Sequence, residues 1–127
     1  MTPEAADHLE KAHRCLTRGR TILAVDVYDV AAREAYLAAF HAAQALIAER
    51  AGRAAKTHRG VHVQFARLTK NEPRLDVELR QFLPKSYDMK ATTDYGVDPG
   101  IGITSEQAVW AINTADRFIQ CVTALLS

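Results

Sequence analysis

The sequence predicts an all-α protein, an up-and-down bundle of four to five helices that forms one domain over residues 1–127. Apolar residues recur three and four positions apart, and no segment alternates apolar and polar residues in the way a strand would. With 48% hydrophobic and 24% charged residues, the 127-residue chain has the composition of a globular protein. A chain of this size can bury one core without disulfides or metals.

The first helix is predicted to begin at the N-terminus of the sequence. Thr2 is a suitable N-cap, Pro3 fits the first helical position, and Glu4 complements the helix dipole. Its apolar face continues to about residue 25, with Gly19 as a point where the helix could break. A short connection follows, in which Asp26 or Asp29 could cap the second helix.

The second helix is expected to continue to about Arg50. Tyr36, Phe40 and Ile47 lie near the centre of its apolar face, together with several alanines. His41 lies on a second, partly polar flank, where we expect a packed ring with one nitrogen bonded to a neighbour. Two covered flanks mean that this helix is either central in the bundle or pairs with another chain.

Cap residues mark the three remaining helices. Thr57 can cap the third and Asp76 the fourth, while Thr104 with Gln107 forms a capping box at the last. Pro84 must either kink or split the fourth helix, since a proline inside a helix removes a hydrogen bond and clashes with the preceding turn. Residues 95–103 contain three glycines and a proline, which predicts a loop.

Charge and cysteine content limit the cellular setting. The net charge of +1 gives no general attraction to nucleic acid or acidic membrane, so any such binding requires a local patch. No apolar run reaches the length of a membrane span, and the first residues lack the pattern of a signal peptide. Cys15 and Cys121 are then expected to be free thiols of a cytoplasmic protein.

A basic segment without acidic residues separates the second and third helices. Its positive side chains can bind phosphate, and the N-terminus of the third helix adds its dipole; we name as phosphate or RNA ligands Arg50, Arg53, Lys56 and Arg59, with Arg33 on the second helix. His58 and His62 are one turn apart, but no acid or cysteine near them completes a tetrahedral metal site. We therefore expect no metal and no cofactor.

A third polar stretch, YDMKATTDYG, precedes the glycine-rich loop. Lys90 and Asp94 are spaced to form an ion pair on one helical face, and Tyr95 follows at the mouth of the loop. Functional groups often occupy loops held by a rigid scaffold, so this pair is either a site element or a surface ion pair.

Four segments in order resemble the HEPN-domain family, and specifically its short, single-domain prokaryotic branch. They are AAREAYLAAFHAAQALI, KTHRGV, YDMKATTDYG and SEQAVWAINTADRFI, and the likeness covers residues 9–125. This resemblance implies a helical bundle, usually a homodimer, often encoded beside a minimal nucleotidyltransferase as a toxin–antitoxin pair. Many members of the family are metal-independent endoribonucleases, so the resemblance also implies this activity.

The shared motif of those ribonucleases is an arginine, four to six residues, then a histidine, in a cleft between protomers. This chain instead has Lys90, three residues, then Asp94 and Tyr95, a pair common in the histidine region of the similar branch. Arg53 and His58 have the motif's spacing but lie before the third helix. Lysine keeps the charge without the bidentate fork of arginine.

Two functions remain open. In the first, the chain acts on RNA: His41 or His58 takes the proton from a ribose 2′-hydroxyl, Lys90 stabilises the phosphorane, and Asp94 and Tyr95 line the same cleft. In the second, the domain is a non-catalytic module that dimerises through its second or last helix and docks the nucleotidyltransferase or another partner. The first function requires His41 to lie close to Asp94.

Overall fold

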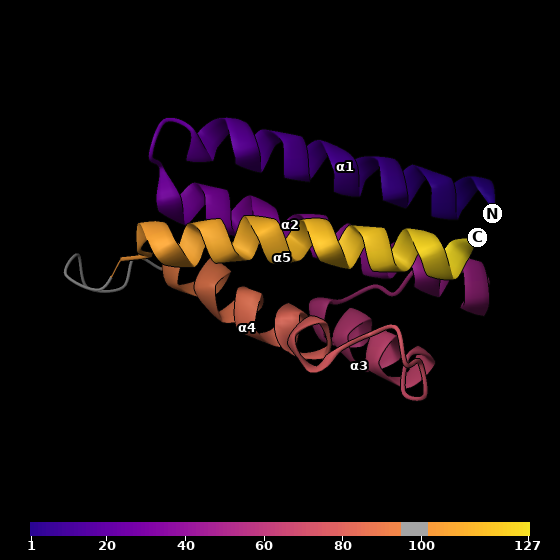
Figure 1. The fold of residues 1–127 in the computed structure, drawn as a ribbon. Helices are drawn as coiled ribbons and strands as arrows, with labels where there is room; N and C mark the ends of the chain where they lie inside the picture. The colour runs from indigo at the N-terminus through magenta and orange to yellow at the C-terminus, as the bar shows by residue number, and fades with distance from the viewer. Residues whose placement is uncertain (95–101) are drawn as a thin grey trace.

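Five helices make up the part of the chain that the computed structural model describes, residues 1–94 and 102–127, with the last four residues of α4 described by their backbone only. They are α1 (Pro3–Leu23), α2 (Tyr28–Ala51), α3 (His58–Leu68), α4 (Val77–Asp94) and α5 (Ser105–Leu126). Figure 1 shows α1, α2 and α5 running alongside one another, with the shorter α3 and α4 against the same bundle and both chain ends at one end of it. The predicted helical bundle is therefore confirmed.

The second helix is the centre of the bundle. It packs against each of the other four helices, and fourteen of its residues, from Ala31 to Ala48, are buried. Its alanines allow these close approaches on more than one flank. The alternative left open by the sequence is thereby decided, because neighbours within the same chain cover both flanks. The covered flanks of α2 therefore give no support to the predicted homodimer, which stays an untested prediction.

One glycine in α1 allows the helices of the bundle to pack closely. Gly19 does not break the helix; it is buried, and a Cβ at this position would lie 2.6 Å from Ile112 Cδ1 and 3.2 Å from Glu34 Cβ. The missing side chain thus lets α1 approach α2 and α5 closely, which outweighs the low helix propensity of glycine.

The start of α2 differs from the prediction that an aspartate caps it. Val27 occupies the N-cap position and makes no side-chain cap bond. Asp26 instead has a φ of 64°, a left-handed conformation that aspartate tolerates better than most residues, and so closes the turn. Asp29 lies in the first turn of the helix, where its charge complements the dipole.

The other predicted helix ends agree with the structure. Thr57 accepts a hydrogen bond from Gly60 N, Asp76 accepts one from Leu79 N, and Thr104 and Gln107 form both bonds of the capping box. The helix containing Pro84 is not split and runs unbroken to residue 94. None of the helices in the described part of the chain combines the length and apolarity needed to span a bilayer.

Candidate functional site

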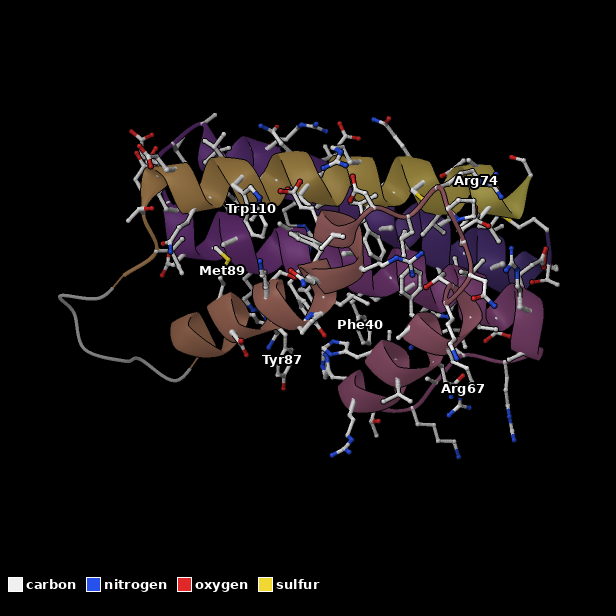
Figure 2. All side chains as sticks on the ribbon, turned by 60° about the horizontal axis from the view of Figure 1, so that its bottom comes forward. Phe40, Arg67, Arg74, Tyr87, Met89 and Trp110 are labelled. Atoms are coloured by element: carbon white, nitrogen blue, oxygen red, sulfur yellow. The ribbon has the colours of Figure 1, made fainter. Side chains whose placement is uncertain are left out.

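Two histidines and two tyrosines meet where α3 and α4 cross the middle of α2. This tyrosine–histidine cluster consists of Tyr36, Phe40, His58, His62 and Tyr87. Figure 2 shows Phe40 and Tyr87 on the side of the bundle where α3 and α4 lie. The ring centroid of each histidine lies within 6 Å of the ring centroids of both Tyr36 and Tyr87. Phe40 lies against His58, with 4.6 Å between ring centroids.

The local sequence explains why both histidines face the same way. Thr57 caps α3, so His58 is its first helical residue and His62 follows one turn later on the same face. Val61 and Phe65 of α3 are buried and bind this helix to the core. The two imidazoles are consequently held at the rim of that core, partly buried and partly open to solvent.

The hydroxyl of Tyr36 joins the two histidines. Tyr36 is completely buried, and its oxygen lies 2.7 Å from His58 Nδ1 and 3.0 Å from His62 Nε2. Burial, and then the neighbouring Tyr87, raise the pKa of Tyr36, so the phenol keeps its proton. The sequence predicts a core position for Tyr36 but no partner for its hydroxyl, and it gives no signal for a role of Tyr87.

Lys90 lies beside this cluster. Its Nζ is 6.0 Å from the centroid of the Tyr87 ring, one turn earlier on α4. Burial, and then the charge of Lys90, lower the pKa of His58. The imidazole is therefore neutral near pH 7, with a lone pair available to accept a proton. The structure thus brings together two of the predicted site residues, His58 and Lys90.

Asp94 and Tyr95 cannot be added to this group. The side chain of Asp94 and all of Tyr95 lie outside the described residues, so the predicted proximity of His41 to Asp94 is untested. His41 itself lies on the α1 side of Phe40: its ring is 5.4 Å from Phe40 and stacks on His8 of α1 at 6.2 Å.

The predicted phosphate ligands are spread over the molecule. Lys56 and Arg59 are exposed on either side of His58 at the start of α3. Arg53 is exposed in the loop, whereas Arg50 donates to the carbonyl oxygen of Leu125 at the C-terminal end of α5, 3.4 Å away. Arg33 lies one turn before Tyr36 on α2 and is partly buried. Of these five residues, Lys56 and Arg59 are the two nearest to His58 in the sequence.

The loop before α3 is fixed by a buried side chain of α2 to which the sequence analysis assigns no role. Gln44 is buried on α2, and its amide donates to Ala55 O and accepts from Ala55 N, both at 2.9 Å. These two bonds satisfy a partly buried backbone unit in the middle of the loop. They thereby fix the conformation of the loop that leads to Lys56 and His58 at the start of α3.

The pair of His8 and His41 makes the stability of the fold pH-dependent. Within the described residues, Nδ1 of each ring is buried and has no hydrogen-bond partner. Burial, followed by the charges of His8 and Lys11, lowers the pKa of His41 to about 4, and burial also lowers that of His8. The ring of His41 is packed as predicted, and the bond predicted for one of its two nitrogens is not made by Nδ1.

We expect the free energy of unfolding to fall as the pH drops from about 6.5 towards about 4. The native state binds fewer protons than the unfolded chain in this range, so acid favours unfolding. In denaturant titrations, His41→Leu should flatten this decline, while His13→Gln, at an exposed position of α1, should leave it unchanged. An equal decline in wild type and His41→Leu would contradict the assignment.

Comparison with known proteins gives the same picture of the chain. The family model of the HEPN domain matches residues 5–125. The chain is 29% identical over 111 residues to the protein of Methanocaldococcus jannaschii named "Putative toxin MJ0142", which covers 87% of this chain and 74% of that protein. The crystal structure of TT1696 from Thermus thermophilus has the same fold, with a TM-score of 0.77, 22% identity, and coverage of 97% of this chain and 98% of that one.

Proposed function

Because this chain belongs to the HEPN domain family, we propose that it is the toxin-like member of a toxin–antitoxin or defence pair and that it acts on RNA. The similarity to a protein named as a toxin in Methanocaldococcus jannaschii supports the first part. The tyrosine–histidine cluster supports the second part. We further propose a homodimer and a minimal nucleotidyltransferase as the partner, as the family resemblance implies, and a cytoplasmic setting, as the two cysteines suggest.

The observation that carries the proposal is that His58 and Lys90 both lie near the ring of Tyr87. His58 is neutral near pH 7, partly open to solvent, and held by Tyr36 at Nδ1. Lys90 supplies a positive charge close to it. A neutral imidazole beside a cation is suited to remove a proton from a hydroxyl group whose attack creates negative charge.

The proposed reaction is a transesterification within RNA. His58 takes the proton from a ribose 2′-hydroxyl, and the 2′-oxygen forms a bond to the adjacent phosphorus. The bond from phosphorus to the 5′-oxygen breaks, and this oxygen takes a proton from solvent, while His58 returns its own proton to solvent. Lys90 balances the charge of the phosphorane, and Lys56 and Arg59 bind neighbouring phosphates. The products are a 2′,3′-cyclic phosphate and a 5′-hydroxyl.

This function predicts that the purified protein cuts single-stranded RNA in the presence of a chelator. An oligonucleotide labelled at both ends should yield fragments with cyclic phosphate and 5′-hydroxyl ends. A matched oligonucleotide with a single 2′-deoxy sugar at the cut position should resist cleavage there, because the nucleophile is missing. Equal cleavage of both oligonucleotides would contradict the mechanism.

A second candidate function is a non-catalytic partner-binding module. It is favoured by the departure from the family's ribonuclease motif, since Lys90 stands where arginine is expected and no histidine follows His62. In that case the cluster only stabilises the crossing of α2, α3 and α4. If the folded protein cuts no RNA, RNA cleavage is rejected and partner binding remains as the proposed function.

A further inference from the structure

The exposed side of α3 and the loop before it carry positive charges without acidic partners. Within the described part of the chain, no ion pair involves the side chains of Arg53, Lys56, Arg59, Arg67 and Lys70. Elsewhere, ion pairs with aspartate or glutamate hold Lys11, Arg14, Arg18, Arg20, Arg74 and Arg117. The small net charge of the chain therefore conceals one surface of unbalanced positive charge.

The sequence explains why these charges are left unbalanced. No acidic residue occurs between Glu49 and Glu72. These two carboxylates bind other groups, because Glu49 lies 3.3 Å from the N-terminal amine and Glu72 lies 2.7 Å from Arg74 Nε. The positive side chains between them are consequently available to an anion from outside the chain.

Four of these charges form a line along α3. Arg59, Val63 and Arg67 are all exposed and four residues apart, so they lie one above another on one helical face. Lys56 precedes the helix and Lys70 follows it. We call Lys56, Arg59, Arg67 and Lys70 the α3 basic face. The helix rises about 12 Å from Arg59 to Arg67, which is too far for a single phosphate to bridge.

A cavity lies at the C-terminal end of this face. It has a volume of about 220 Å³ and is lined by Phe65, Ala66, Thr69, Lys70, Leu75 and Arg80. Phe65 and Leu75 are buried and give it an apolar wall. Lys70 belongs to both the cavity and the α3 basic face, so the two features are continuous. Figure 2 shows Arg67, the preceding cation of the face, on the same side of the bundle as Tyr87 of the tyrosine–histidine cluster.

Arg80 is held in place at this cavity. Its guanidinium group donates to the carbonyl oxygens of Thr69 and Glu72, at 2.8 Å and 2.5 Å, just after the end of α3. The plane of a guanidinium group stacks on aromatic rings, and nucleobases bind proteins in this way. An apolar wall, a fixed guanidinium group and the charge of Lys70 together suit a base with its phosphate.

We propose that the α3 basic face and the adjoining cavity bind single-stranded RNA, with the backbone along the cations and one base against Arg80. The inference rests on the proposed function, because Lys56 and Arg59 flank His58 and so connect this surface to the point of cleavage. An acidic protein would balance the same charges but would leave the cavity beside Arg80 unused. The line of cations and the cavity together therefore favour a nucleic acid.

The backbone contacts can be measured without cleavage. An oligonucleotide with a 2′-O-methyl group on every sugar lacks the proposed nucleophile, so fluorescence anisotropy reports its binding at equilibrium. Arg59→Gln and Arg67→Gln should each reduce the dependence of log K on log salt concentration by about 0.7, the value for one phosphate contact on a single strand. Arg14→Gln is the matched control, since Arg14 is exposed on α1, across the bundle from α3 (Figure 1), and should leave this slope unchanged.

A variant of the cavity tests the position of the base. Ala66→Leu places a larger side chain at an exposed position of the cavity wall and keeps a residue with high helix propensity. It should weaken binding of the methylated oligonucleotide by roughly two- to fivefold, the contribution of a cation–π contact at an exposed site. Binding of an abasic oligonucleotide with the same number of phosphates should not change, because no base enters the cavity.

The outcomes separate this inference from the proposed function. An unchanged salt slope in either arginine variant, or Ala66→Leu acting equally on both oligonucleotides, would overturn the inference. Equally tight binding of poly-glutamate would also overturn it and identify an acidic protein as the partner. Folded wild-type protein that shows the expected binding but cuts no RNA rejects the proposed function and supports the inference. RNA cleavage by wild type with unchanged slopes in both variants rejects the inference and keeps the function.

Discussion

His58→Gln should lower the rate of RNA cleavage by about 10²- to 10⁴-fold, the range that a general base contributes. Glutamine has a similar polar shape and can still bond to Tyr36, but it has no basic nitrogen to accept the ribose proton. Lys90→Ala should lower the rate by about 10²- to 10³-fold, because the charge that develops on the phosphorane is then unbalanced. Single-turnover rates on an excess of enzyme measure both losses at the chemical step.

Matched controls are available for each position. Lys85 is an exposed lysine on the same helix as Lys90, and His13 is an exposed histidine on α1. Lys85→Ala and His13→Gln should therefore leave the rate unchanged. Circular dichroism and thermal unfolding of each variant show whether the fold persists. Wild-type rates in folded His58→Gln or Lys90→Ala would remove that residue from the mechanism.

The fold could be predicted largely from local signals in the sequence. The capping box of Thr104 and Gln107 and the cap at Thr57 involve residues only three positions apart, so the sequence contains both partners of each bond. Pro84 shows the limit of such signals, since kinking and splitting were both open. Ser86 donates to the carbonyl oxygen of Phe82 in this turn, and the helix continues through it.

The start of α2 was predicted wrongly because two conformations of aspartate compete. Asp26 is a good N-cap residue, but it is also one of the few residues that accept a positive φ. The chain uses the second property: Asp26 closes the turn and Val27 takes the cap position. The packing of α1 against α2 decides which of the two conformations Asp26 adopts, and the sequence of the turn alone does not reveal this packing.

The candidate site was predicted only in part for a related reason. His58 and Lys90 stand out in the sequence because His58 is one turn from His62 and Lys90 stands where the family's motif has an arginine. The role of Tyr36 depends on a bond between residues 22 positions apart, which exists only once α2 and α3 cross. The position of His41 likewise depends on the register of α1 against α2, which brings His8 to its ring.

The aromatic core beneath the cluster allows the largest predicted effect on stability. Phe118 of α5 is completely buried, and its ring lies 5.0 Å from Phe65 and 6.2 Å from Phe82. Phe118→Ala should therefore lower the free energy of unfolding by about 3–5 kcal/mol, through lost burial and the cavity left beside the rings of Phe65 and Phe82. The midpoint of thermal unfolding should fall by about 10–20 °C.

The matched control is a truncation on the opposite side of the same helix. Val109 is 42% exposed on α5, so Val109→Ala should change the free energy of unfolding by no more than about 0.5 kcal/mol. Denaturant titrations of both variants with equal m-values would show that the loss comes from the native core and not from the unfolded chain. If Phe118→Ala lowers the free energy of unfolding no more than Val109→Ala does, then α5 does not close the core in the way that the structure shows. The packing that holds α3 and α4 against α2 would then have to be different.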